Sequence, residues 1–164
     1  MVIAAALFLA LALGAAAGFF LDRRRQEQTA KALGLYEEGV RLVDCEGPMF
    51  RFAVKWDEGC AYAVTDVKAA PVRIPLEDIA GCEFSDGGTK AQGVGASVGR
   101  FIVGGAVADA MDEGLRGTAL RIYRKEPGSR AVEYRLRRST YLEDFRRFAK
   151  EVSALVEEIT EEYE

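Results

Sequence analysis

The feature that most constrains this chain is an uninterrupted apolar run at its beginning. Val2 to Leu21 is 20 residues long and contains no charge, no proline and no polar side chain. At 1.5 Å per residue, a helix of this length spans the roughly 30 Å hydrocarbon core of a bilayer. Ten of the 20 residues are Val, Ile, Leu or Phe, which together favour insertion by about 3 to 6 kcal/mol. The run predicts a transmembrane helix over residues 1–21, and the side chains expected to contact lipid include Val2, Leu7, Leu13, Phe20 and Leu21.

A cleaved signal peptide is the alternative explanation of the same run. The small residues Ala15, Ala16 and Ala17 would fit a cleavage site. However, no Lys or Arg precedes the run, and the run is longer than the apolar part of an ordinary signal peptide. We therefore expect a permanent anchor.

Basic residues on one flank of the run predict its orientation. Arg23, Arg24 and Arg25 follow it directly, whereas the other flank offers only the start methionine. Basic flanks stay on the cytoplasmic side of a membrane. The sequence thus predicts a single-pass protein of the cell membrane, with its N-terminus outside and residues 22–164 in the cytosol.

Small residues recur every four positions within the apolar run, at Ala6, Ala10, Gly14 and Gly18. This spacing places them along one helix face, where a second helix can approach closely. The stripe indicates a homodimer. Chance is the alternative, because half of the run is Ala or Gly.

The composition of the remaining chain excludes several functional classes. Every charged residue lies after Leu21, and the net charge is -4, which argues against a nucleic-acid partner. The absence of histidine removes the usual catalytic triads and the HExxH zinc site. The three cysteines, Cys45, Cys60 and Cys82, lack a CxxC spacing and are expected to be reduced thiols. We expect no enzyme activity, no cofactor and no metal.

Strand patterns begin after a charged segment. Residues 22–38 are expected to continue the first helix as a stalk until Gly39 interrupts it. From Met49 to Trp56, apolar and polar residues alternate as in a half-buried strand. A turn with Gly59 then leads to a strand containing Cys60, Tyr62 and Val64. Shorter strands are expected at Val40–Cys45, Val72–Ile74 and Ile79–Phe84.

A second hairpin is expected between residues 116 and 138, with its turn at Glu126-Pro127-Gly128-Ser129. It carries eight Arg or Lys residues against two Glu, a local net charge of +6. Alternate positions of a strand share one face, so a basic face that contacts anionic lipid is predicted. The alternative is a solvated face paired with acidic residues from elsewhere. The expected lipid-contacting residues are Arg121, Arg124, Arg130, Arg135 and Arg137.

The final segment, Thr140 to Glu162, predicts an amphipathic helix. Thr140 and Glu143 have the spacing of a capping box at its start. The apolar residues that follow recur at helical spacing and predict one buried face. They are Leu142, Phe145, Phe148, Val152, Leu155, Val156 and Ile159.

The order of these elements, together with the phrase Ile74-Pro75-Leu76-Glu77-Asp78-Ile79, resembles a bacterial pleckstrin-homology-like (PH-like) domain. The resemblance covers roughly residues 40–159. It implies an α+β fold over residues 39–164, with an antiparallel β-barrel or sandwich whose open end is plugged by the C-terminal helix. It also implies a binding or assembly module. The first strand connection, Cys45 to Met49, departs from the phosphoinositide-binding members because it contains no Lys or Arg.

A glycine-rich insertion at residues 93–114 is the most distinctive stretch after the anchor. Its first glycines imitate a dinucleotide fingerprint, but they follow a polar run instead of a buried strand. The carboxylates Asp109, Asp112 and Glu113 are expected to be a solvated helix end, with a hard-cation site as the alternative. We predict a helix or helical hairpin that packs through Gly95, Gly99 and Gly104, and a membrane-interface location is the alternative.

These observations predict a non-enzymatic, membrane-tethered binding or scaffold module at the cytosolic face. Its partners would be the bilayer, an unidentified protein and a second copy of the chain. The alternative function is an anionic-lipid surface sensor that acts through the basic hairpin.

Overall fold

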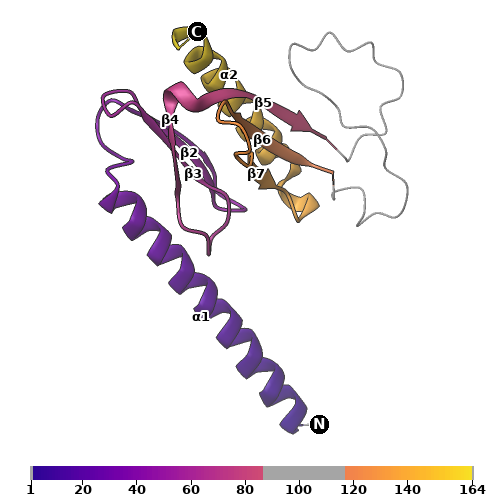
Figure 1. Ribbon diagram of the computed structural model, residues 1–164. Helices are drawn as coiled ribbons and strands as arrows, with labels where there is room; N and C mark the ends of the chain where they lie inside the picture. The colour runs from indigo at the N-terminus through magenta and orange to yellow at the C-terminus, as the bar shows by residue number, and fades with distance from the viewer. Residues whose placement is uncertain (1, 87–116, 164) are drawn as a thin grey trace. The chain divides into compact units, whose positions relative to one another are not determined.

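The computed structural model describes residues 2–86 and 117–163 and shows an α+β chain (Figure 1). The chain divides into two compact units, Met1–Glu38 and Gly39–Glu164. The expected helical insertion at residues 93–114 lies outside the described residues, and so do its glycines and carboxylates.

The first unit is built on one continuous helix, α1, at Val2–Ala32 (Figure 1). It includes the whole predicted membrane segment and the first part of the predicted stalk. Six of its large apolar side chains, from Leu7 to Leu21, are between 49% and 71% exposed. Within the part of the chain that the structure describes, no helix combines the length and the apolar character needed to cross a membrane.

The prediction that the stalk helix reaches Glu38 is wrong, because Gly34 ends the helix earlier. Gly34 has a φ of +65°, a conformation that costs glycine little. Its N–H donates to the Lys31 carbonyl at 3.0 Å, and the Leu35 N–H donates to the Ala30 carbonyl at 3.0 Å. This pair of bonds is the Schellman motif, which satisfies the last carbonyls of a helix.

Four strands of the second unit form one antiparallel sheet in the order β1-β2-β3-β4. The turn between β2 and β3 contains Gly59 with a φ of +60°, as the sequence predicts. The expected strands are therefore confirmed, with small changes at their ends. Their bounds are β1 Val40–Cys45, β2 Phe50–Lys55, β3 Cys60–Val64 and β4 Val72–Pro75.

The prediction that β2 is half-buried is wrong, since all six of its residues are buried. The strand lies between β1 and β3, and its alternate residues Phe50, Phe52 and Val54 face the core. The two charged residues on its other face are paired. Arg51 Nε lies 2.9 Å from Asp44 Oδ1, and the Lys55 ammonium pairs with Glu58. Burial of a charge is tolerated when it has such a partner.

A second antiparallel sheet has the order β5-β6-β7 and does not close into a barrel with the first. The short 3-10 helix η1, Leu76–Asp78, connects the two sheets. In the turn between β6 and β7, Gly128 has a φ of +81° and the Ser129 N–H donates to the Glu126 carbonyl at 3.1 Å. The predicted turn is thus confirmed. The strands are β5 Ile79–Ser85, β6 Ala119–Arg124 and β7 Val132–Arg135.

The chain continues through the 3-10 helix η2, Ser139–Tyr141, into the helix α2, Leu142–Glu162. The predicted capping box is wrong, because the residue at the N-cap is Tyr141, which makes no side-chain capping bond. The 3-10 turn places Thr140 one residue too early to cap α2. Glu143 pairs instead with Arg146.

The apolar face of α2 packs against β5 and β1 and closes the core of the second unit (Figure 1). Its predicted face is buried, except that Leu142 is only partly covered. The Phe148 ring lies 5.1 Å from the Tyr134 ring and 6.2 Å from the rings of Phe50 and Phe145. The buried Tyr134 hydroxyl donates to the Arg51 carbonyl at 2.8 Å, which ties the second sheet to the first.

Candidate functional site

The predicted anchor side chains lie along α1. Leu7, Leu13, Phe20 and Leu21 are all exposed, while the side chain of Val2 lies outside the description. Arg23, Arg24 and Arg25 are exposed on the part of α1 that follows.

The glycines of the predicted dimer seam are open. A Cβ built on Gly14 or Gly18 would meet no heavy atom within 4 Å.

The five hairpin arginines do not share one face as expected. Arg121 and Arg135 lie on the outer face of the second sheet, and both bind Glu133, with N–O distances of 2.7 Å. Arg124 is the last residue of β6 and alternates with the buried Leu120 and Ile122. It pairs with Asp78. Arg130 is exposed after the turn. Arg137 lies after β7, with Nη2 3.9 Å from Asp66 Oδ2.

Carboxylates from outside the hairpin reduce its local positive charge. Asp66 comes from the connection between β3 and β4, and Asp78 comes from η1. Glu83 of β5 lies directly opposite Arg121 and accepts a hydrogen bond from the Tyr123 hydroxyl. These three carboxylates offset half of the excess of +6 along the chain.

Asp78 is a structural residue that the sequence reasoning missed. Its Oδ1 accepts the Glu126 N–H at 2.9 Å, its other oxygen binds Arg124, and its carbonyl accepts the Lys125 N–H at 2.6 Å. It thereby fastens the corner between the sheets to the turn of the second hairpin. Burial alone would raise the pKa of this carboxyl, but the bonds from Arg124 and Glu126 hold the pKa below its ordinary value. No local pattern signals this role, because Arg124 and Glu126 lie 46 and 48 positions further along the chain.

Replacing this carboxylate should make the free energy of unfolding depend less on pH. Asp78→Asn is expected to lower the free energy of unfolding at neutral pH by roughly 1.5 to 3 kcal/mol, the value of hydrogen bonds to a charged group. Because the folded pKa is depressed, the ionised carboxylate contributes fully above its unfolded pKa of about 3.9 and loses its contribution as pH falls through the folded pKa. Urea unfolding at pH 7 and at pH 3 should show the difference between variant and natural chain shrinking in acid. A constant difference would contradict this role.

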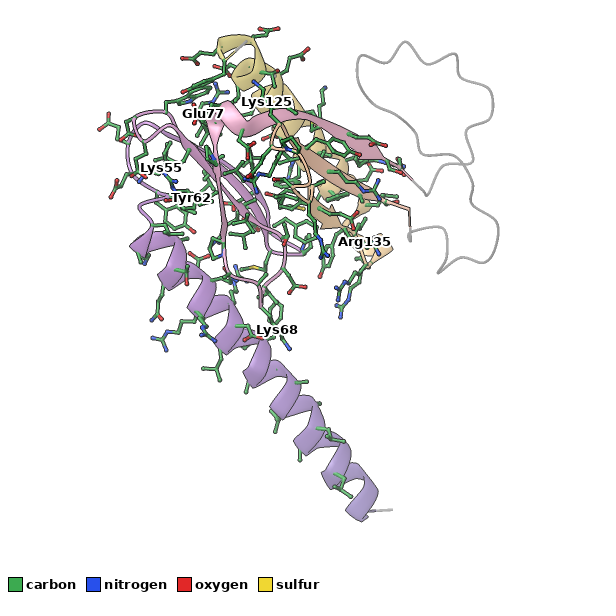
Figure 2. All side chains as sticks on the ribbon, in the orientation of Figure 1. Lys55, Tyr62, Lys68, Glu77, Lys125 and Arg135 are labelled. Atoms are coloured by element: carbon green, nitrogen blue, oxygen red, sulfur yellow. The ribbon has the colours of Figure 1, made fainter. Side chains whose placement is uncertain are left out.

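Among the residues that the structure describes, none of the three cysteines forms a disulfide. Burial raises the pKa of Cys45 to about 12, so its thiolate is disfavoured and the side chain is chemically inert. Cys60 is also buried, but it lies opposite Lys55 in the ladder between β2 and β3, with its Sγ 3.7 Å from Glu58 Oε2. The sequence reasoning missed this charged neighbourhood, because Lys55 and Cys60 become neighbours only when the hairpin folds. Figure 2 shows Lys55 and Tyr62 on this sheet.

No group of three or more potential metal ligands occurs among the residues that the structure describes. The chain matches no family model, no curated protein and no solved structure.

Proposed function

We propose that this chain is a membrane-tethered binding module that acts without catalysis. In this proposal α1 spans the cell membrane with its N-terminus outside. The second unit is a PH-like domain that holds a protein partner at the cytosolic face.

The tether is supported by the apolar surface of α1. Leu11, Leu13, Phe19 and Phe20 are among six large apolar side chains exposed on different sides of the helix. Apolar area left in water costs roughly 25 cal/mol per Å² relative to burial, whereas a bilayer removes that cost. The arginine triplet after Leu21 supports the orientation.

The order of elements is the observation that carries the PH-like assignment. A sheet of four strands is followed by a sheet of three and then by an amphipathic helix packed against both sheets. The phrase from Ile74 to Ile79, which bears the resemblance in sequence, forms the corner between the sheets. Its apolar residues Ile74, Leu76 and Ile79 are fully buried there.

The connection between β1 and β2 supports a protein partner over an inositol phosphate. It has no Lys or Arg, and the Met49 N–H closes it into a tight turn by donating to the Glu46 carbonyl. Gly47 lies directly against the Tyr141 ring, which leaves no room for a Cβ at this position. The ion pairs of the hairpin likewise give the lipid-sensor alternative less support.

Recovery of crosslinked partners from membranes tests this function. The full chain should enrich a protein partner, and a chain without residues 2–21 should recover much less, since tethering raises the effective concentration at the membrane. An unrelated apolar helix of the same length, fused in place of residues 2–21, is the matched control and should restore recovery.

Salt distinguishes the two functions. Attraction of the hairpin to anionic headgroups fades with ionic strength, whereas an apolar protein contact persists. Strong, salt-sensitive binding to anionic vesicles without any enriched protein would contradict the proposal and favour a lipid sensor.

A further inference from the structure

The edge strands of the second unit differ in how they are protected. An edge strand presents unpaired N–H and C=O groups, which template pairing with another chain unless they are blocked. The two sheets have four edges, at β1, β4, β5 and β7.

Prolines block the edge at β4. The Leu76 N–H donates to the Gly59 carbonyl, so the backbone groups of Ile74 and Val72, at alternate positions, also face β3. The outward positions are Pro71, Arg73 and Pro75. Because proline has no N–H, this edge offers one donor flanked by two blocked positions.

The helix α2 packs against two other edge strands, β1 and β5. A register shift between Ile79 and Gly81 further interrupts β5, as a bulge does at many sheet edges. At the other end of the strand, Asp86 Oδ2 accepts Arg146 Nε at 2.9 Å, which fastens the chain to α2.

The edge at β7 has no such protection among the described residues. The Leu136 N–H donates to the Thr118 carbonyl at 3.0 Å, so Leu136, Tyr134 and Val132 direct their backbone groups toward β6. The backbone groups of Glu133 and Arg135 therefore point away from the sheet, and within residues 2–86 and 117–163 they bond to no other element. Figure 2 shows Arg135 on this strand, away from Lys125 in the turn at the other end of the hairpin.

We propose that β7 pairs antiparallel with β7 of a second copy of this chain. In an antiparallel pair centred on Tyr134, Glu133 of each copy lies opposite Arg135 of the other copy. Opposite charges in directly facing positions stabilise a strand pair. Moving the register by two residues would set Arg135 against Arg135, a like-charge pair, and would leave Glu133 opposite Arg137, which lies beyond the end of β7. The edge is thus complementary to itself, as a two-fold interface requires.

This pairing depends on the proposed function, because the membrane tether is needed to make a weak contact between two copies stable. A four-residue strand buries less than the roughly 1,200 Å² of a stable protein interface. Two tethered copies meet at a high effective concentration, which compensates for a weak contact. The open faces of Gly14 and Gly18 on α1 are compatible with a two-fold pair of chains.

Disulfide crosslinking of the full chain in lipid vesicles tests the register. One preparation carries Glu133→Cys and the other Arg135→Cys. In the proposed antiparallel pair of β7 strands, residues that face each other have Cα atoms about 5.5 Å apart, within the range that a disulfide bridges. Two copies of the same variant would hold their new cysteines roughly 8 Å apart, which is too far. Mixing the two variants should therefore give several-fold more covalent dimer than either alone.

A second pair of variants avoids the ion pairs of Glu133. The same register places residue 131 opposite residue 137, so Ala131→Cys mixed with Arg137→Cys should behave in the same way. The unsubstituted chain, with Cys45, Cys60 and Cys82, gives the background.

Flotation of the vesicles distinguishes failure of the tether from failure of the pairing. If the chains float and neither mixture exceeds its separate variants, the pairing is wrong. If the chains do not float, the proposed tether is wrong. The pairing of β7 strands must then give the same crosslinking pattern in solution at high protein concentration. Equal crosslinking in a single variant and in its mixture overturns the proposed register.

Discussion

Truncating Phe148 to alanine is expected to lower the free energy of unfolding of the second unit by about 3 to 5 kcal/mol. The side chain is 1% exposed and contacts the rings of Tyr134, Phe50 and Phe145. It therefore joins α2 to both sheets. Removing it leaves a cavity at the point where the three layers meet, and close-packed neighbours relax only partly into such a space. Denaturant unfolding followed by near-ultraviolet circular dichroism measures the loss.

Arg147→Ala is the matched control on the same helix. Arg147 is 64% exposed and pairs only at the surface, with Asp144 at 3.3 Å. Its removal should change the free energy of unfolding by less than about 0.5 kcal/mol. Similar losses in the two variants would mean that α2 does not pack through this face.

Placing two charges in α1 is expected to release the protein from membranes. Each change in Leu11→Arg/Leu13→Arg replaces a contribution of about -0.3 to -0.6 kcal/mol by about +2.5 to +3.5 kcal/mol at the helix centre. The pair costs roughly 6 to 8 kcal/mol, more than the 3 to 6 kcal/mol by which the natural run favours insertion. The variant should move from the membrane pellet to the supernatant after centrifugation.

Gln28→Arg/Ala32→Arg adds the same charge to the same helix beyond the arginine triplet. Both positions are exposed and lie outside the apolar run. This control should remain in the pellet. If both double variants stay in the pellet, insertion of α1 does not hold the protein at the membrane.

The strands and the buried face of α2 were predictable because their signals are local. Period-two alternation in Phe50 to Lys55 and helical spacing from Phe145 to Ile159 need no knowledge of the rest of the chain. The turns at Gly59 and Gly128 likewise follow from glycine's tolerance of positive φ.

The wrong predictions concern bonds and neighbours that appear only in the folded chain. The sequence predicted that Gly39 ends α1, whereas the bonds that Gly34 and Leu35 make back into the helix end it earlier. The burial of Arg51 and Lys55 depends on the central position of β2 in its sheet, which alternation alone does not reveal.

The candidate surfaces were the least predictable part, because their charges are balanced by residues distant in the chain. Arg124 meets Asp78 across 46 positions of sequence, and Glu83 meets Tyr123 across 40. A count of charges within the hairpin therefore overstated its basic character. The open edge at β7 also became visible only once the strand order and hydrogen-bond register were known.

Protease protection in intact cells tests the central claim most directly. An epitope tag after Glu164 should be found in the membrane pellet, should resist protease added outside intact cells, and should be digested once the membrane is permeabilised. This result is required if α1 is an anchor with Arg23, Arg24 and Arg25 on the cytosolic side. A tagged protein that is digested in intact cells, or that is released in soluble form beginning near Gly18, would contradict the membrane-tethered account.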